Sequence, residues 1–277
     1  MTHEFSTISC VVDGAIATIT LQRPEAANAL SAAMIDEIDA ALDLIEHDDD
    51  VRVVVLAAAG RHFCAGHDLK ELFAGTEPWA AKRATGAEGK LEHEQVMYFD
   101  RCVRIRDFPK PTIAAVHGSC AAAGLMLAAM CDLIIAADDA RFSNPVLPMS
   151  GVGVELLVEP WELGPRKAKE FLLCAETLSA PDAERYGLVN RVVPIAELTA
   201  ATREMADKVA LVPPVTARAI KDTINATVDR MGQRDSWKYH FMVHQFVSNT
   251  ETAIALMRAR ADGGMDHVKR EQSGTPT

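Results

Sequence analysis

Two stretches of the sequence combine glycine with small residues directly after an apolar run. The first is GRHFCAGHDLKEL, residues 60–72, and the second is HGSCAAAGLMLAAMCD, residues 117–132. In each, a strand-like run gives way to a bend and then to a helical pattern, so backbone N–H groups at the bend lack a partner. Two such groups aimed at one point form an oxyanion hole, which stabilises negative charge on a carbonyl oxygen. The same small residues also permit close helix packing without any catalytic role, and both interpretations stay open at this level.

Cys64 and Cys120 lie within these two stretches, where a thiolate can act as a nucleophile. Apolar neighbours raise the pKa of a thiol, and neither cysteine has a base next to it in the sequence. We therefore expect both to be buried packing thiols.

The elements around the two stretches predict an α/β fold with a largely parallel sheet. Residues 8–21 read as a hairpin that turns at Asp13-Gly14, and residues 31–50 as an amphipathic helix capped by Ser31. Continuous apolar runs indicate strands covered on both faces, each next to a helical segment. These runs are residues 51–60, 112–118 and 132–139.

The rest of the chain divides into one loop and a helical end. Residues 74–90 have no clear period and read as a mobile loop beside the site. From about Pro194 the pattern is helical throughout, while the tail from 266 to 277 has little to bury and is expected to be disordered. The expected helices cover residues 196–211, 214–231, 235–248 and 250–262.

Composition excludes several classes of protein. The 277 residues carry a net charge of −11 and no basic stripe, which argues against a nucleic-acid partner. Six scattered cysteines without a CxxC pair fit neither a metal site nor a disulfide framework. No apolar stretch is long enough to suggest a membrane span, so we expect a cytoplasmic protein that binds no membrane.

Several motifs, in order along residues 8–262, resemble the crotonase, or enoyl-CoA hydratase/isomerase, superfamily. They are LQRPEAANAL, GRHFCAGHDLKEL, KPTIAAVHGSCAAAGLMLAAMCDLIIAADDARFSNP and ETLSAPDAERYGLVNRVV. The resemblance implies a spiral core of ββα units over residues 1–195 and a helical trimerisation region over 196–265. It also implies a trimer or a dimer of trimers that binds acyl-CoA thioesters, with no cofactor beyond the coenzyme A of the substrate.

Carried over to this sequence, the resemblance places the oxyanion hole at the backbone N–H groups of His67 and Ala123. Family members usually have a small residue and a glycine at these positions, so both side chains here narrow the pocket without removing the donors. The substrate-binding positions it implies are Ala27, Ala65, His67, Asp68, Leu69, Lys70, Ala123, Gly124, Met126 and Val146.

Hydratases of this family hold a water between two glutamates, and the matching positions here carry Met126 and Val146. Neither side chain can carry a proton, so ordinary hydratase activity is not expected. Glu155 lies in the region where related isomerases and dehalogenases place another carboxylate, and we expect it near the start of a helix. It is the first candidate for the missing acid or base, ahead of Glu159 and Glu162, and the alternative is a solvated glutamate that the helix dipole stabilises without a catalytic role.

Histidine is the second candidate type, because an imidazole titrates near neutrality. His67 is foremost, followed by His62, His93 and His117, and a purely structural role is open for each. Three hypotheses follow: an enzyme that uses Glu155 or a histidine on an unusual acyl-CoA, a non-catalytic protein that binds CoA thioesters, or a true hydratase with other catalytic groups.

Overall fold

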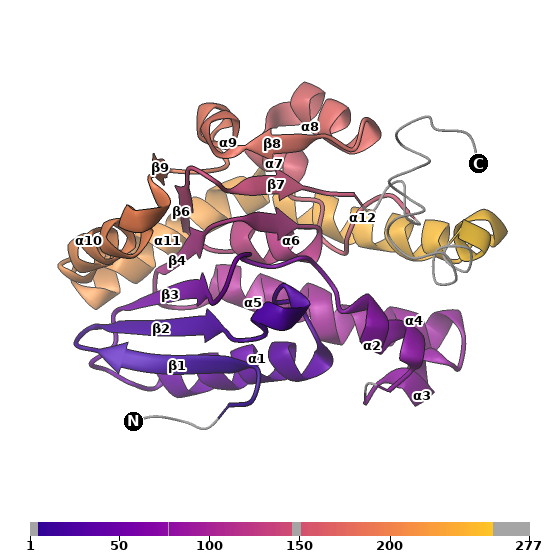
Figure 1. The fold of residues 1–277 in the computed structure, drawn as a ribbon, viewed down its shortest axis with the longest axis horizontal. Helices are drawn as coiled ribbons and strands as arrows, with labels where there is room; N and C mark the ends of the chain where they lie inside the picture. Colours follow the sequence, from indigo (N-terminus) through magenta and orange to yellow (C-terminus); the bar gives the residue numbers. More distant parts are fainter. Residues whose placement is uncertain (1–4, 77, 146–150, 257–277) are drawn as a thin grey trace.

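The computed structural model describes residues 5–76, 78–145 and 151–256. Its main sheet has six strands in the order β1-β2-β3-β4-β6-β9 (Figure 1). Their bounds are Ile8–Asp13, Ile16–Leu21, Val53–Ala58, Thr112–Val116, Leu133–Ala137 and Arg191–Val193. Only β1 and β2 pair antiparallel among the strands of this sheet, through a turn in which Gly14 has a φ of 59°. The predicted hairpin and parallel α/β sheet are therefore confirmed.

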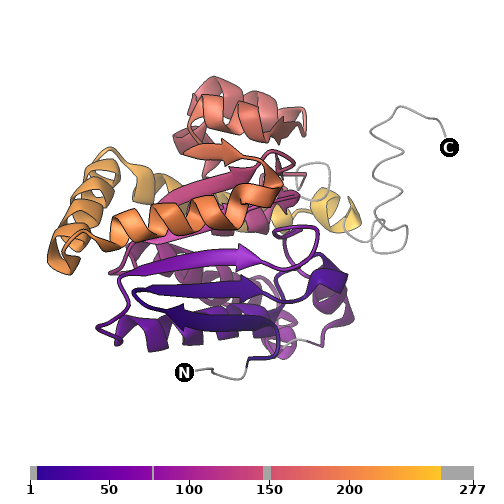
Figure 2. The ribbon, with the colours of Figure 1, turned by 60° about the vertical axis from the view of Figure 1, so that its left-hand side comes forward.

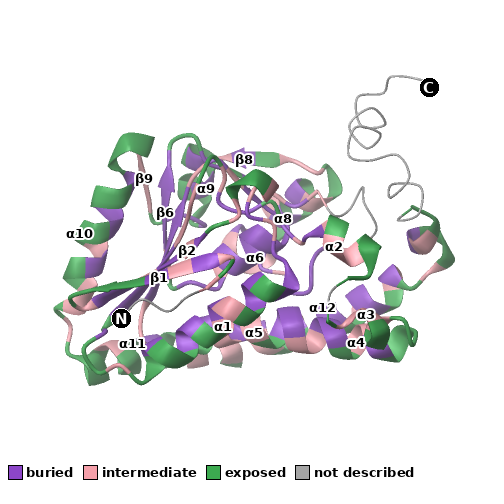
Figure 3. Ribbon diagram, turned by 60° about the horizontal axis from the view of Figure 1, so that its bottom comes forward, coloured by how far each residue is buried: buried purple, intermediate pink, exposed green. Residues whose placement is uncertain are grey.

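The central strands are apolar on both faces, with Thr112 of β4 the one polar residue in β3, β4 and β6, and the sheet is accordingly covered on both sides. In β3, Val53 and Val55 belong to the cluster on the face covered by α10 (Leu198–Ala210), and Val54 and Leu56 to the opposite core. Figures 2 and 3 show α10 across one face, with buried and exposed residues alternating along it. The other face carries α1 (Ala32–Glu46), whose first turn is capped by Ser31 as predicted.

A second, three-stranded sheet lies in the order β5-β7-β8, with bounds Ser119–Ala121, Arg141–Ser143 and Thr177–Ser179. Strand β5 leads directly into α6 (Ala123–Ala129), all but the last residue of which is buried. This sheet therefore positions the second of the two glycine-containing stretches. Two further helices, α8 (Gly164–Leu173) and α9 (Ala180–Tyr186), flank β8 in the chain.

The expectation of a loop over residues 74–90 is wrong. The described part of this segment contains the end of α2 (Leu69–Ala74), then α3 (Ala80–Arg83) and the start of α4 (Ala87–Glu94). The segment lacks an apolar period because α3 and α4 are short and the buried residues of α4 are Gly89, His93 and Glu94, none of which is a large apolar residue. A π-helix (Gln95–Asp100) and α5 (Arg101–Asp107) continue from α4 toward the sheet.

The C-terminal part is helical as expected. After α10 come α11 (Pro214–Arg230) and α12 (Gln233–Ser248), and residues 251–256 are again helical. The predicted tail lies outside the described residues. Within the part of the chain that the structure describes, none of the helices is both long and apolar enough to cross a membrane.

Candidate active site

The two glycine-containing stretches lie side by side. Cys64 forms a parallel bridge with Cys120: its N–H donates to the Ser119 carbonyl at 3.0 Å, and its carbonyl accepts from the Ala121 N–H at 2.9 Å. Gly124 is required for this approach, since a Cβ atom there would lie 2.5 Å from the Cys64 carbonyl oxygen. At Gly66, with a φ of 103°, a Cβ would lie 3.1 Å from the Ala122 Cβ and 3.6 Å from the Ala123 nitrogen.

The backbone N–H of His67 is directed away from the segment at Leu30 that lies next to it. Leu30 donates to the Gly66 carbonyl at 2.8 Å and accepts from the Asp68 N–H at 3.0 Å, which makes a parallel bridge centred on His67. In such a bridge the central residue points its own N–H to the opposite side. No described residue accepts a hydrogen bond from this N–H.

The second donor is the N–H of Ala123, the first residue of α6. Ala122 precedes it in a backbone conformation with a φ of 49°, held by its own N–H donating to the Ser143 carbonyl at 2.9 Å. A first-turn N–H has no acceptor within its helix, and the described residues supply none from elsewhere. The two amides predicted to form an oxyanion hole are thus both unpaired, on loops in direct contact.

His67 and Glu155, which the sequence suggested as alternatives, form one pair. The Nε2 of His67 lies 3.0 Å from the Oε2 of Glu155, and their side chains are 14% and 4% exposed. The Nδ1 of His67 is buried and has no hydrogen-bond partner. The ring packs on Tyr98, with 4.2 Å between ring centroids.

The pair shifts both pKa values in the direction that favours its charged form. Burial alone would raise the pKa of Glu155, but the charge and hydrogen bond of His67 lower it to about 2. Burial alone would lower the pKa of His67, but Glu155 raises it above its ordinary value. With Glu155 accepting the Nε2 proton, Nδ1 is the atom whose protonation decides whether His67 is charged or neutral.

Glu155 does not lie at a helix start, contrary to the expectation from sequence. It lies in a bend over residues 151–156, before α7 (Glu159–Glu162). The bend is held by three ring N–H groups of α12. Trp237 donates to the Leu157 carbonyl at 3.1 Å, His240 to the Val154 carbonyl at 2.8 Å, and His244 to the Gly153 carbonyl at 3.0 Å. Their spacing of three and four residues puts these donors on one helix face, a signal that the sequence contained and our reading missed.

The predicted substrate-binding residues differ in their exposure to solvent. Ala65 and Lys70 are exposed, and Ala27 and Leu69 are partly buried. Asp68 is buried, accepts from the Glu71 N–H at the start of α2 and pairs with Arg23 at 2.8 Å, so its carboxylate already has partners.

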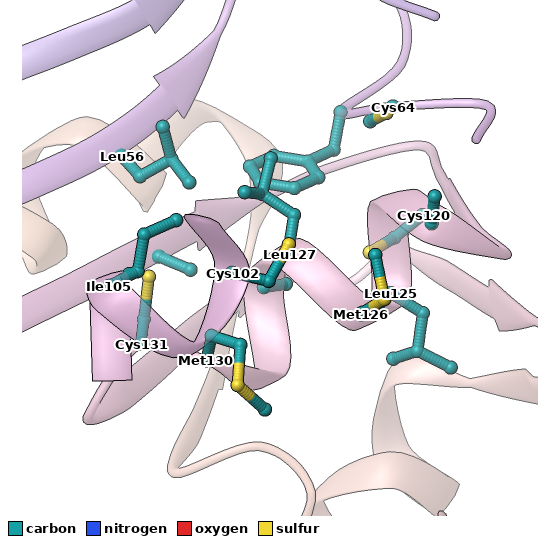
Figure 4. Packing of buried hydrophobic residues seen from close by; sticks show 14 of the residues in the cluster. Leu56, Cys64, Cys102, Ile105, Cys120, Leu125, Met126, Leu127, Met130 and Cys131 are labelled. Atoms are coloured by element: carbon teal, nitrogen blue, oxygen red, sulfur yellow. The ribbon is translucent and has the colours of Figure 1, made fainter. Parts of the chain in front are cut away.

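Met126 is fully buried in the core beside Cys120 and Leu125 (Figure 4). Val146 lies outside the described residues.

The thiols are packing groups. Burial raises the pKa of Cys64 to about 12 and that of Cys120 well above its ordinary value. A nucleophilic role needs a thiolate, so the expectation of packing thiols is supported.

Two other histidines contact backbone. The Nδ1 of His62 accepts from the Ser119 N–H at 3.1 Å, and the Nε2 of His117 donates to the Gly60 carbonyl at 3.0 Å. His93 is buried, with its ring 5.4 Å from that of Tyr98.

The other two glutamates do not contact the His67–Glu155 pair. Glu159 is buried, accepts from the Asn144 amide at 2.6 Å and has a raised pKa because of burial. Burial also raises the pKa of Glu162, to about 7.

Comparison with known proteins defines the class. The profile of the family described as "Enoyl-CoA hydratase/isomerase" matches residues 12–258. A "Putative enoyl-CoA hydratase EchA13" of Mycobacterium tuberculosis is 42% identical over 254 residues, which cover 87% of this chain and 80% of that protein. The chain therefore belongs to the enoyl-CoA hydratase/isomerase family, within the crotonase superfamily of enzymes.

Solved structures agree with this assignment. A probable enoyl-CoA hydratase from Mycobacterium smegmatis is 46% identical with a TM-score of 0.81, over 87% of this chain and 93% of that one. An enoyl-CoA hydratase/isomerase from Xanthobacter autotrophicus is 31% identical with a TM-score of 0.85, over 99% and 100%. The predicted crotonase-like α/β fold is thereby confirmed.

Proposed function

We propose that this enzyme binds an acyl-CoA and moves a proton next to the thioester carbonyl. The thioester oxygen accepts hydrogen bonds from the N–H groups of His67 and Ala123. The base is the Nδ1 of His67, the ring nitrogen nearer to that residue's own backbone. The observation that carries the proposal is the pairing of His67 with Glu155 at 3.0 Å, which leaves Nδ1 buried and unpartnered beside an unpaired amide.

The reaction is a transfer of one proton. Nδ1 takes a proton from the carbon next to the thioester carbonyl, and the electron pair of that C–H bond moves onto the carbonyl oxygen as an enolate. The two amides stabilise the negative charge there. Return of the proton to the same carbon exchanges it, and return two carbons further along a conjugated chain shifts the double bond. Glu155 holds the ring and stabilises the imidazolium that forms, as the carboxylate does in a Ser-His-Asp triad.

Hydration is not the reaction we propose. The resemblance puts the two water-holding glutamates at Met126 and Val146, and Met126 is fully buried among apolar side chains. Without these two glutamates an added water loses the groups that would hold and activate it, and one such general acid or base contributes about 10²–10⁴-fold.

Local features support binding of a CoA thioester and of further copies of the chain. Lys70 is exposed in α2, directly after the His67 loop, where it can meet a phosphate despite the net charge of −11. The C-terminal helices expose large apolar side chains, including Leu211 at 81%, Val215 at 82% and Phe246 at 74%. Such a surface favours self-association, and we propose a trimer or a dimer of trimers.

The six cysteines are free, which suits a reducing compartment such as the cytoplasm.

The proposal is tested with saturated and unsaturated acyl-CoAs incubated with the enzyme in D₂O. We expect deuterium at the carbon next to the carbonyl, detected by mass spectrometry, and binding of acetyl-CoA in a calorimetric titration. Binding without any exchange would contradict the proposal and favour a non-catalytic thioester-binding protein. Absence of both would remove acyl-CoA as the ligand.

A further inference from the structure

A buried carboxyl and a buried amide meet at the end of the strand that holds the second oxyanion donor. Asn144 directly follows β7 and Glu159 is the first residue of α7, and Figure 1 shows α7 close to β7. The side-chain nitrogen of Asn144 lies 2.6 Å from the Oε1 of Glu159, and the two residues are only 1% and 2% exposed. The proposed reaction uses neither residue.

The pair lacks a hydrogen-bond donor as long as Glu159 is charged. With the amide nitrogen of Asn144 facing Glu159, the Oδ1 of Asn144 and the Oε2 of Glu159 are both buried without a hydrogen-bond partner. With the amide turned over, Oδ1 faces Oε1 at 2.6 Å, and two acceptor oxygens at that distance need a proton between them. A proton on Glu159 supplies the missing donor in both arrangements.

The surroundings of Glu159 favour the neutral acid. Burial raises its pKa, against the opposing contributions of the Asn144 amide and of the backbone N–H groups of Val158 and Glu159 itself. No charged side chain of the described residues is among these contributors. The charged residues closest to the pair along the chain are Arg141, Glu155, Glu162 and Arg166. A buried carboxyl without a cationic partner is more stable when it is protonated.

Ser143 connects the pair to the oxyanion hole. It precedes Asn144 and pairs with Ala121 in the small sheet, and its carbonyl accepts from the Ala122 N–H at 2.9 Å. Ala122 has a φ of 49°, a conformation that a residue other than glycine keeps only where its neighbours hold it. The direction of the next N–H, that of Ala123, therefore depends on the position of the end of β7.

We propose that Glu159 keeps its proton at neutral pH, pairs with Asn144 as a carboxylic acid and thereby positions the Ala123 amide of the oxyanion hole. The role of that amide rests on the proposed function. Glu159 acts through Asn144 and Ser143, so it is a positioning residue. Loss of its proton leaves a buried charge without a partner, and the pair must then separate or admit water. The end of β7 moves with it, so proton exchange on the substrate should slow as pH rises through the pKa of Glu159.

The protonation of Glu159 is tested in the full chain without substrate, so that the result does not depend on the proposed reaction. Infrared spectra separate the carbonyl stretch of a protonated carboxyl from that of a carboxylate. Because the pKa of Glu162 is also raised, to about 7, the comparison is between Glu162→Gln and the double variant Glu159→Gln/Glu162→Gln. We expect a protonated-carboxyl band at neutral pH in Glu162→Gln and its loss in the double variant.

Absence of this band from Glu162→Gln, or its persistence in the double variant, would overturn the proposal. If the double variant does not fold, the spectrum of Glu162→Gln carries this test alone.

The positioning role is tested by deuterium exchange into an acyl-CoA. Glutamine can donate to and accept from Asn144 as the neutral acid does, but it has no proton to lose in this pH range. Glu159→Gln should therefore keep the wild-type rate at neutral pH and lose the decline at alkaline pH. Glu159→Ala should be slower by about tenfold or more, toward the roughly 10²–10³-fold that loss of one oxyanion donor costs. The matched control is Glu162→Gln, at the other end of α7, which should keep the alkaline decline.

Equal rates in the wild type and Glu159→Ala, or an alkaline decline that persists in Glu159→Gln, would overturn the positioning role. Denaturant titration identifies a variant that does not fold, and the other variant then carries the test. Absence of exchange in the wild type would contradict the proposed function and leave this inference to acetyl-CoA affinity. That affinity should be about three- to tenfold weaker in Glu159→Ala than in Glu159→Gln, because the thioester oxygen loses one hydrogen bond. Equal affinities would overturn the inference.

Discussion

Replacing Glu155 by glutamine removes the charge next to His67 while keeping nearly the same shape. The carboxylate can only accept from the His67 Nε2–H, at 3.0 Å and with 4% of the Glu155 side chain exposed. An amide can instead turn its NH₂ toward Nε2, and the ring must then carry its proton on Nδ1, where it cannot act as a base. We expect proton exchange on an acyl-CoA to slow by about 10²–10⁴-fold, or about 3–5 kcal/mol in activation free energy.

The same substitution should move the pH dependence in a defined direction. The active form is the neutral ring, with a proton on Nε2 and none on Nδ1. The rate therefore falls as pH drops below the pKa of His67. In the wild type, burial lowers this pKa and Glu155 raises it, with a net increase. Without the charge of Glu155, the effect of burial is no longer offset, and the pKa of His67 falls. The acid limb of the rate profile should therefore move to lower pH in Glu155→Gln, while the maximum rate drops.

The pair also contributes to stability over a pH window set by its shifts. Because the pKa of Glu155 is lowered, its contribution to the free energy of unfolding is complete above its ordinary pKa of 4.5 and is lost as pH falls toward about 2. Because the pKa of His67 is raised, its contribution is complete below its ordinary pKa of 6.5 and is lost as pH rises through the raised pKa. The difference in unfolding free energy between wild type and variant should be largest between these two ordinary values.

The assay follows deuterium incorporation into a saturated acyl-CoA by mass spectrometry over the neutral pH range. The matched control is Glu162→Gln, which removes a partly buried carboxyl that does not contact His67 and whose pKa, unlike that of Glu155, is raised. Equal rates and an unmoved acid limb in Glu155→Gln would refute the catalytic pair. Loss of exchange in the Glu162 variant alone would transfer the role to that residue.

Three further predictions concern the loops, the reaction and the assembly. Gly124→Ala places a methyl group 2.5 Å from the Cys64 carbonyl oxygen. Denaturant titration should therefore show a free energy of unfolding lower by about 1–3 kcal/mol, and proton exchange on an acyl-CoA should be slower. Unchanged values of both would contradict the packing of the two loops. Hydration of crotonyl-CoA, followed by loss of enoyl absorbance, should stay well below the common range of ~1–10³ s⁻¹ because Met126 is apolar; turnover within that range would contradict the assignment. Val215→Glu charges an 82% exposed apolar position and should lower the oligomer mass in sedimentation, and an unchanged mass would place the interface elsewhere.

The fold was largely predictable because its signals are local. The continuous apolar run of β3 predicted a strand covered on two faces. In the structure α10 covers one face, and the core that includes α1 covers the other. The turn at Gly14 and the Ser31 cap depend on residues adjacent in sequence. The helices α3 and α4 were missed because α3 is only one turn long and the buried positions of α4 carry glycine, histidine and glutamate, which give no apolar period.

The two loops were predictable from the sequence, and the side-chain pairs were not. The loops follow from glycines within short stretches and the resemblance then pointed to the amides of His67 and Ala123, whereas His67 and Glu155 are 88 residues apart in the chain. Nothing local indicates that α12 would bring His244 against Glu94, 150 residues away. Sequence spacing could reveal that Trp237, His240 and His244 share one helix face, but their carbonyl partners depend on tertiary packing.

The most direct test of the proposed reaction is a crystal structure with a bound, non-reactive acyl-CoA analogue. We expect the thioester oxygen about 2.7–3.1 Å from the backbone nitrogens of both His67 and Ala123. The Nδ1 of His67 should then face the carbon next to the carbonyl, while Nε2 stays on Glu155. A thioester oxygen outside the two amides, or a reacting carbon that faces Glu159 or Glu162 in place of His67, would contradict the account.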